Sequence, residues 1–100
     1  MIFTEISLRT ENASPCWSLK NGYYVTNGHG QTDECYETFT EAKLKCLAAG
    51  DCKAIATQSN ICAGKFRVTH GIPVFRWYRH WRSYNLKAYE YTCPTGNEFR

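Results

Sequence analysis

Apolar residues recur at helical spacing in one segment of the chain, residues 38–49. One face of this segment carries its apolar residues, which are Phe39, Ala42, Cys46 and Ala49. Thr38 and Glu41 form a capping box at its start, Thr40 is an alternative N-cap, and Gly50 is a typical C-cap. We therefore predict a single helix over these residues.

Elsewhere apolar and polar residues alternate at period two, which is typical of strands. We expect strands in four segments, which are 17–25, 52–57, 62–69 and 86–93. The first segment crosses the turn signal Asn21-Gly22, so it is either a strand or a hairpin. Residues 75–84 fit a helix face and a strand about equally well.

Six cysteines in 100 residues are an even number at high density, which indicates a disulfide framework. No pair has the Cys-x-x-Cys spacing of a zinc ribbon, and the three histidines do not have the spacing of zinc ligands. The predicted fold is a small, disulfide-rich domain of the α+β class. Because disulfides need an oxidising compartment, we expect a secreted protein or the extracellular face of the cell surface.

Six cysteines can pair in fifteen ways. Cys46 lies near the end of the predicted helix and Cys52 opens the next strand, so a bridge between these two would close a short loop. If the other pairs nest outward from this bridge, they join Cys35 to Cys62 and Cys16 to Cys93.

The chain divides into an N-terminal extension or edge strand over 1–15, a domain over 16–93 and a C-terminal tail over 94–100. Residues 1–5 have neither the basic start nor the apolar segment of a signal peptide. With oxidised cysteines we therefore expect a mature form or a domain cut from a longer protein. The sequon Asn12-Ala13-Ser14 makes Asn12 a candidate glycosylation site.

The order of cysteines, helix and strands resembles the PAN/apple family. The resemblance is carried by Cys35, the helix Phe39-Thr40-Glu41-Ala42-Lys43-Leu44-Lys45-Cys46 and the strand Cys52-Lys53-Ala54-Ile55-Ala56, and the remaining cysteines extend it over 16–93. It implies an antiparallel sheet packed on a single helix. It also implies nested disulfides, which here are Cys16–Cys93, Cys35–Cys62 and Cys46–Cys52, and a non-enzymatic module that binds proteins or carbohydrates, including sulfated and galactose-type glycans. The sequence departs from the family's pattern in having Cys35 ahead of the helix and in the basic residues among the aromatic residues of 75–84.

Charge is distributed unevenly along the chain. The formal net charge is +3, but residues 52–89 hold seven basic side chains and no acidic one. Arg76, Arg79 and Arg82 alternate with aromatic residues over 75–84, which we call the basic aromatic block. Guanidinium groups match sulfate, phosphate and carboxylate geometry, and aromatic faces stack on planar or ring-shaped ligands.

Two interpretations of the basic aromatic block remain open. In the first, it forms a ligand face together with neighbouring basic residues: Lys65, Arg67, Arg76, Trp77, Arg79, Trp81 and Arg82. In the second, its aromatic residues are core and its arginines pair with acidic residues such as Asp33, Glu34 and Glu37.

Sequence motifs of the common catalytic classes are missing, including Gly-x-Ser-x-Gly, His-Glu-x-x-His and the phosphate-binding glycine loops. We therefore expect no catalytic residues, no cofactor and no metal. No nucleic-acid-binding motif occurs, so nucleic acid is not an expected partner. No apolar run approaches the length of a membrane span, so membrane insertion is not expected either.

The expected function is that of an extracellular binding module whose partner is a glycan, with an anionic or sulfated glycan favoured by the basic aromatic block. The second hypothesis is a protein–protein adhesion or receptor–ligand module on the same fold. The third is a small secreted toxin or protease inhibitor.

Overall fold

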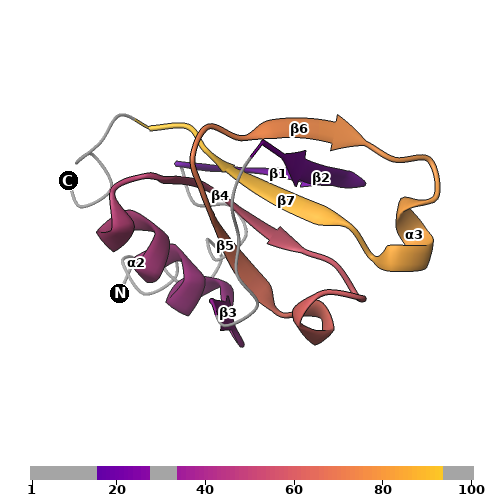
Figure 1. Cartoon of the computed structure of the whole chain (residues 1–100), viewed down its shortest axis with the longest axis horizontal. Helices are drawn as coiled ribbons and strands as arrows, with labels where there is room; N and C mark the ends of the chain where they lie inside the picture. The colour runs from indigo at the N-terminus through magenta and orange to yellow at the C-terminus, as the bar shows by residue number, and fades with distance from the viewer. Residues whose placement is uncertain (1–15, 28–33, 94–100) are drawn as a thin grey trace, which may run out of the picture.

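A computed structural model describes residues 16–27 and 34–93 (Figure 1). Three predicted features lie outside the described residues: the edge strand over 1–15, the sequon at Asn12 and the tail over 94–100. In chain order, the described elements are β1 (Trp17–Asn21), β2 (Tyr23–Thr26), β3 (Cys35–Tyr36), α2 (Phe39–Ala49), β4 (Cys52–Thr57), the 3-10 turn η1 (Cys62–Gly64), β5 (Phe66–His70), β6 (Val74–Trp77), α3 (Trp81–Tyr84) and β7 (Lys87–Tyr91).

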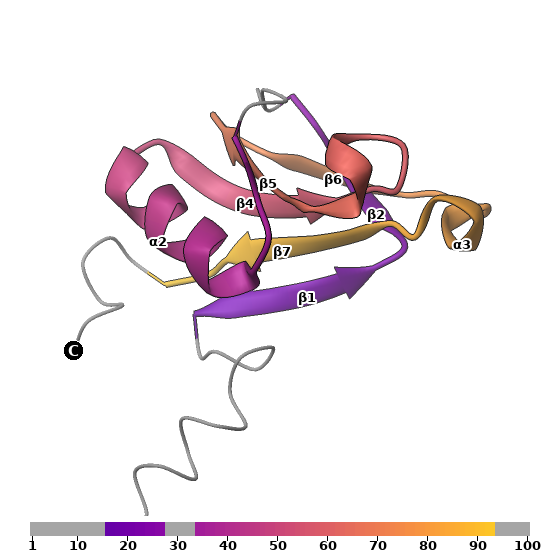
Figure 2. The ribbon, with the colours of Figure 1, turned by 90° about the horizontal axis from the view of Figure 1, so that it is seen from below.

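The elements are arranged in three layers. The middle layer is a five-stranded antiparallel sheet in the order β1-β7-β4-β5-β3. Helix α2 packs on one face of this sheet, and an antiparallel ribbon of β2 and β6 lies on the other face (Figure 2). The predicted α+β class and the antiparallel sheet with one main helix are therefore confirmed, and the ribbon is a layer that the sequence did not predict.

The hydrophobic core lies between α2 and the five-stranded sheet. Phe39 is buried and its ring centroid lies 4.5 Å from that of Tyr89 on β7. Ile55 and Val68, from the two central strands, are fully buried in the same cluster. Each side chain of this size contributes about 1.5–3 kcal/mol when it is removed from water, so this interface dominates the stability of the domain.

Helix α2 begins and ends where the sequence predicts. The backbone N–H of Glu41 donates to the Thr38 hydroxyl oxygen over 3.1 Å, and the Thr38 N–H donates to the Glu41 carboxylate over 3.4 Å, which completes the capping box. Gly50 follows the helix with a φ of 85°. The expectation that Ala49 lies on the buried face is wrong, because the chain turns away toward β4 at this last helical residue.

The predicted hairpin over 17–25 is not formed, although both strands are present. β1 pairs with β7, whereas β2 pairs with β6 in the other sheet. The cause is Gly22 between them, whose φ of 86° sends the chain from the first sheet into the ribbon.

Two other segments are divided in the structure. Residues 62–69 start as η1, where Cys62 and Ala63 have φ values of 56° and 53°, and become a strand only at Phe66. Residues 75–84, which fitted helix and strand equally, contain both, since β6 ends at Trp77 and α3 begins at Trp81.

Three nested disulfides join the layers and the ends of the chain. They are Cys16–Cys93, Cys35–Cys62 and Cys46–Cys52, the pairs expected from the sequence, with Cα–Cα distances of 4.9, 6.0 and 5.1 Å. The first joins the start of β1 to the end of the neighbouring strand β7, the second joins β3 to η1, and the third joins α2 to β4. Within the described ranges, no helix combines the length and the apolar character that a membrane span requires.

Candidate functional site

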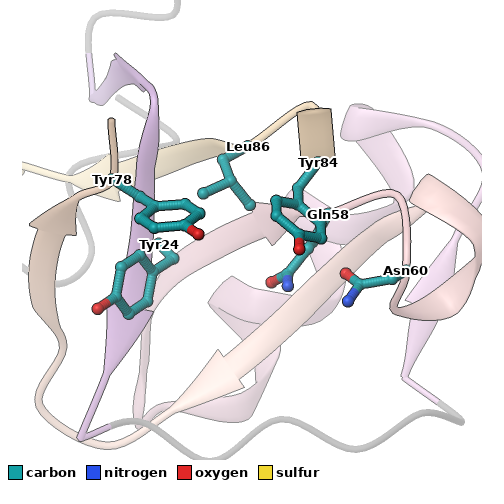
Figure 3. Close-up of a pocket in the computed structure, with 6 residues that line it drawn as sticks. All are labelled: Tyr24, Gln58, Asn60, Tyr78, Tyr84 and Leu86. Carbon is teal, nitrogen blue, oxygen red and sulfur yellow. The ribbon is translucent and has the colours of Figure 1, made fainter. Parts of the chain in front are cut away.

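A cleft of about 350 Å³ opens between the ribbon, α3 and one end of the five-stranded sheet (Figure 3). Its lining residues come from five places in the chain: Tyr24, Gln58, Asn60, Tyr78, Tyr84 and Leu86. In Figure 3 the Tyr78 and Tyr84 rings flank Leu86, and the amide groups of Gln58 and Asn60 lie below and beside Tyr84. The ring centroids of Tyr78 and Tyr84 are 6.0 Å apart. Three tyrosines and one leucine thus line the cleft, with two amide groups at one side.

Backbone hydrogen bonds of Gly22 hold two sides of the cleft in place. Its N–H donates to the carbonyl oxygen of Leu86 over 2.9 Å, and its carbonyl oxygen accepts from the N–H of Tyr78 over 3.0 Å. An added Cβ at Gly22 would lie 2.9 Å from Cγ of Trp81 and 3.0 Å from Nε1 of Trp77. Only glycine therefore fits between these indole rings.

The opposite side of the cleft is fixed by two further backbone contacts. The N–H of Ser59, between the two amide residues, donates to the carbonyl oxygen of Tyr84 over 2.8 Å. Asn85 adopts a left-handed conformation with a φ of 54°, which ends α3 and directs the chain to Leu86 at the start of β7.

The chemistry of the cleft suits a polar ligand with an apolar ring face. Tyrosine rings offer apolar faces and phenol groups that donate and accept hydrogen bonds. The side-chain amides of Gln58 and Asn60 form no hydrogen bond with any other described residue, so their donors and acceptors are available. Each amide group can bind a donor and an acceptor of the ligand at the same time.

None of the seven predicted ligand residues lines this cleft. The Lys65 Nζ lies 2.8 Å from the Glu37 Oε2, and this contact raises the pKa of Lys65. Arg67 is partly buried, and burial lowers its pKa. Within 16–27 and 34–93, no carboxylate pairs with the guanidinium of Arg67 or Arg76.

Within the basic aromatic block, Arg79 and Arg82 each contact the residue next to them in the sequence. Nε of Arg79 donates to Nε2 of His80 over 3.2 Å, and the Arg82 guanidinium lies 4.8 Å from the ring centroid of Trp81. Trp77 is 57% exposed. None of the block's aromatic side chains belongs to the buried core, which removes the interpretation of them as core residues. The assignment of the seven residues to ligand binding stays a prediction.

Two of the acidic residues expected to pair with the arginines form ion pairs with other side chains. Glu37 pairs with Lys65, and Glu34 pairs with His70. Asp33 lies outside the described residues.

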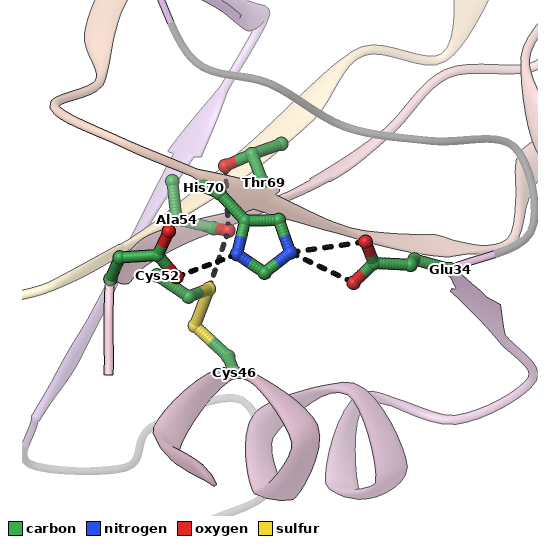
Figure 4. Close-up of a disulfide and its surroundings, with 7 residues drawn as sticks. Glu34, Cys46, Cys52, Ala54, Thr69 and His70 are labelled. Atoms are coloured by element: carbon green, nitrogen blue, oxygen red, sulfur yellow. Dashed lines mark hydrogen bonds and ion pairs between the residues drawn. A yellow bond between two sulfur atoms is a disulfide. The ribbon is translucent and has the colours of Figure 1, made fainter. Parts of the chain in front are cut away.

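A second polar cluster surrounds His70 at the end of β5, beside the Cys46–Cys52 disulfide (Figure 4). Its Nδ1 lies 2.7 Å from Oδ1 of Asp51, and its Nε2 lies 2.9 Å from Oε1 of Glu34. The hydrogen bonds to Asp51 and then to Glu34 raise the pKa of His70, and the bond to His70 lowers that of Asp51. Through these contacts, Asp51 in the α2–β4 turn and Glu34 just before β3 are both linked to β5.

Four residues of the cleft, Tyr24, Gln58, Asn60 and Leu86, could not be identified from the sequence. They share no motif and stand up to 62 positions apart, and long-range backbone contacts such as Gly22 to Leu86 and Ser59 to Tyr84 bring them together. The usable signal was that Tyr78 and Tyr84 belong to the basic aromatic block. Tyr24 and Tyr23 are adjacent on β2, and the sequence alone does not indicate which of them lines the cleft.

Among the described residues, no group of three His, Cys, Asp or Glu side chains is placed to hold a metal ion. Comparisons with protein-family models, with curated proteins and with solved structures found no match to this chain.

Proposed function

We propose that the protein is a non-enzymatic extracellular binding module of the PAN/apple type and that it recognises a glycan through the tyrosine-lined cleft. The observation that carries the proposal is the combination of tyrosine rings with free side-chain amides around one open cleft. Binding sites for small ligands typically combine an aromatic lining with a few directed polar groups. A sugar ring has apolar C–H faces and hydroxyl groups at its rim, which match these two kinds of side chain.

An anionic glycan is the favoured ligand. Arg76 and Arg67 lie on strands beside the cleft and have no carboxylate partner among the described residues. Guanidinium groups bind sulfate and carboxylate through paired, charge-assisted hydrogen bonds. The three disulfides are compatible with an extracellular location and support that part of the proposal.

A protein ligand is the second candidate, favoured by the apolar side chains exposed on the outer part of the ribbon. Ile72 is 78% exposed in the β5–β6 turn, and the exposed Val74 follows it at the start of β6. Exposed apolar residues that lie close together are typical of protein-binding surfaces.

A glycan array probed with the oxidised domain tests the proposal. We expect binding to a restricted set of glycans, and loss of this binding in Tyr24→Ala, which removes one aromatic side of the cleft. Tyr23→Ala is the matched control, because Tyr23 is the neighbouring residue on β2 and does not line the cleft.

Three outcomes decide the question. Specific binding that is lost in Tyr24→Ala and kept in Tyr23→Ala supports the glycan proposal. Absence of binding to all glycans contradicts it and leaves the protein ligand as the better candidate. Equal loss in both variants shows that binding does not depend on the cleft.

A further inference from the structure

The Cys35–Cys62 disulfide differs from the other two in that neither of its residues is buried. Each of the other disulfides has at least one cysteine in the core, because Cys16, Cys46 and Cys52 are at most 5% exposed. The three residues that follow Cys62 are exposed as well. Thiol–disulfide exchange requires an attacking thiolate to reach a disulfide sulfur, so a reductant reaches this pair first.

Arg67 lies beside one of these two cysteines. It is directly opposite Cys35 in the β3–β5 pair, and such residues point to the same sheet face with Cβ atoms about 4.5–5.5 Å apart. Arg67 is partly buried, and none of the carboxylates that the structure describes pairs with it. A positive charge near a cysteine stabilises its thiolate, and a stabilised thiolate leaves faster in exchange. Arg67 therefore favours opening of this disulfide with Cys35 as the leaving group.

The backbone at the other cysteine is strained. Cys62 and Ala63 have φ values of 56° and 53°, where the Cβ of an L-residue comes too close to the following carbonyl oxygen. The turn is closed by the N–H of Gly64, which donates to the carbonyl oxygen of Ile61 over 3.1 Å, and by the N–H of Lys65, which donates to that of Cys62 over 3.0 Å. Reduction removes the covalent link that holds Cys62 in this conformation, so the strain favours the open form.

The same turn continues into the amide side of the cleft. Gln58 and Asn60, which line the cleft, precede Cys62 by four and two positions (Figure 3). Ile61 forms a β-bridge with Gln58, and its N–H donates to the Gln58 carbonyl oxygen over 3.0 Å. Residues 58–64 are therefore one hydrogen-bonded unit, and a change in the position of Cys62 is transmitted to both amides.

Weak contacts hold this unit to β3 when the disulfide is open. β3 has only two residues, and an exposed ion pair between Lys65 and Glu37 joins the same two segments. Exposed ion pairs contribute little to stability. The core and the other two disulfides do not involve this link. Reduction should therefore loosen residues 58–64 locally and leave the rest of the domain folded.

We propose that Cys35–Cys62 is a redox-exchangeable disulfide that sets the position of the amide side of the cleft, and that its reductant is a protein dithiol of the Cys-x-x-Cys type. One thiolate of the dithiol attacks the Cys62 sulfur, and Cys35 leaves as a thiolate beside Arg67. The second thiol of the reductant then displaces Cys62 from the mixed disulfide. Two electrons and the two dithiol protons pass to Cys35 and Cys62, and the reductant becomes a disulfide. The proposal holds whichever ligand the cleft binds.

Partial reduction of the folded, oxidised protein tests the proposal. The probes are reduced thioredoxin, which has a Cys-x-x-Cys site, and dithiothreitol as a small dithiol. New thiols are trapped by alkylation and located by peptide mass spectrometry. We expect alkylation of Cys35 and Cys62 to be at least about tenfold faster than that of the other four cysteines. Faster opening of either other disulfide, or simultaneous opening of all three, overturns the proposal.

Variants of Arg67 test the effect of its charge on the reaction. Arg67→Gln should slow reduction about threefold or more, and Arg67→Lys, which keeps the charge, should restore most of the rate. Arg76→Gln is the matched control, because Arg76 is on the ribbon, which does not pair with β3, and it should change the rate less than about twofold. An unchanged rate in Arg67→Gln, or an equal decrease in Arg76→Gln, contradicts the role of Arg67 in stabilising the leaving thiolate.

NMR spectra of the ¹⁵N-labelled protein test the coupling to the cleft without any ligand. Selective reduction should shift the side-chain amide signals of Gln58 and Asn60. The side-chain amide of Asn27, which donates to the carbonyl oxygen of Ile72 over 3.3 Å at the other end of the ribbon, should stay unchanged. A double variant with Cys35→Ser and Cys62→Ser should reproduce the same shifts without a reductant. Unchanged signals of Gln58 and Asn60, or loss of dispersed signals throughout the domain, overturns the proposed control of the cleft.

Discussion

Gly22 is the residue on which the geometry of the cleft depends most. It combines a φ of 86° with indole rings at 2.9–3.0 Å from the position of an added Cβ. It also makes the two backbone hydrogen bonds that hold Leu86 and Tyr78. At the residue scale, a turn between two strands is therefore also the support of the candidate site.

Gly22→Ala should destabilise the domain and weaken ligand binding together. The left-handed backbone costs about 1–2 kcal/mol for alanine, and displacement of the indole rings adds to this. Gly50→Ala is the matched control, because Gly50 has a φ of 85° and nothing within 4 Å of its added Cβ. Urea unfolding of both variants measures the difference. Equal losses of stability in the two variants would show that the contact with the indole rings contributes nothing.

The chemistry of single residues explains what the sequence did and did not reveal. Gly22 was recognised as a turn signal, but whether the turn closes a hairpin depends on the strand that pairs with β2, which lies more than 45 positions later. The basic aromatic block was recognised by its composition. Its tyrosines line the cleft and its tryptophans do not, and this difference arises from tertiary packing that no local pattern encodes.

At the scale of elements, α2 is the best predicted part of the fold because its signals are local. The capping box, the apolar spacing and Gly50 all lie within thirteen consecutive residues. β4 was predicted with correct bounds for a similar reason, since Cys52 starts it directly after the helical C-cap. The ribbon was missed because each of its strands is short and gains its partner from a distant segment.

Thr38→Ala should lower the free energy of unfolding by about 1 kcal/mol, since it removes the acceptor for the N–H of Glu41 at the start of α2. Thr38→Ser keeps the hydroxyl and should retain most of this stability. Thermal or urea denaturation measures both variants, and glycan binding should stay unchanged in each, because Thr38 does not line the cleft. A stability of Thr38→Ala equal to the wild type would contradict the role of the cap.

At the scale of the whole molecule, the His70 cluster should make stability depend on pH. His70 has a raised pKa, so its contribution is complete below its ordinary value of 6.5 and is lost as the pH rises through the raised value. Asp51 has a lowered pKa, so its contribution is complete above 3.8 and is lost as the pH falls through the lowered value. The cluster therefore stabilises the protein most between these two ordinary pKa values.

Comparison of His70→Gln with the wild type measures this effect. The difference in the free energy of unfolding should be largest at about pH 5, where the wild-type imidazole is charged, and should decrease as the pH rises through the raised pKa of His70. His80→Gln serves as a control, because His80 contacts Arg79 and Tyr78 and no carboxylate among the described residues. A difference for His70→Gln that does not vary with pH would mean that the cluster carries no ionic stabilisation.

In the molecule as a whole, the core and the candidate site lie in different places. Helix α2 lies on one face of the five-stranded sheet, and the β2–β6 ribbon lies on the other (Figure 2). The core lies on the α2 side, and the His70 cluster lies at the end of β5. The ribbon contributes Tyr24 to the cleft. Side chains around the cleft can therefore change with little effect on the core.

The central claim is that a glycan binds in the tyrosine-lined cleft. The most direct measurement is a titration of the ¹⁵N-labelled, oxidised protein with an acidic oligosaccharide, followed by NMR chemical shifts. We predict that the largest shifts occur at the side-chain amides of Gln58 and Asn60 and at the backbone of Tyr78 and Tyr84, with little change in α2. Saturable binding whose shifts cluster on α2 or the His70 side of the sheet, or the absence of shifts at the two side-chain amides, would contradict the account.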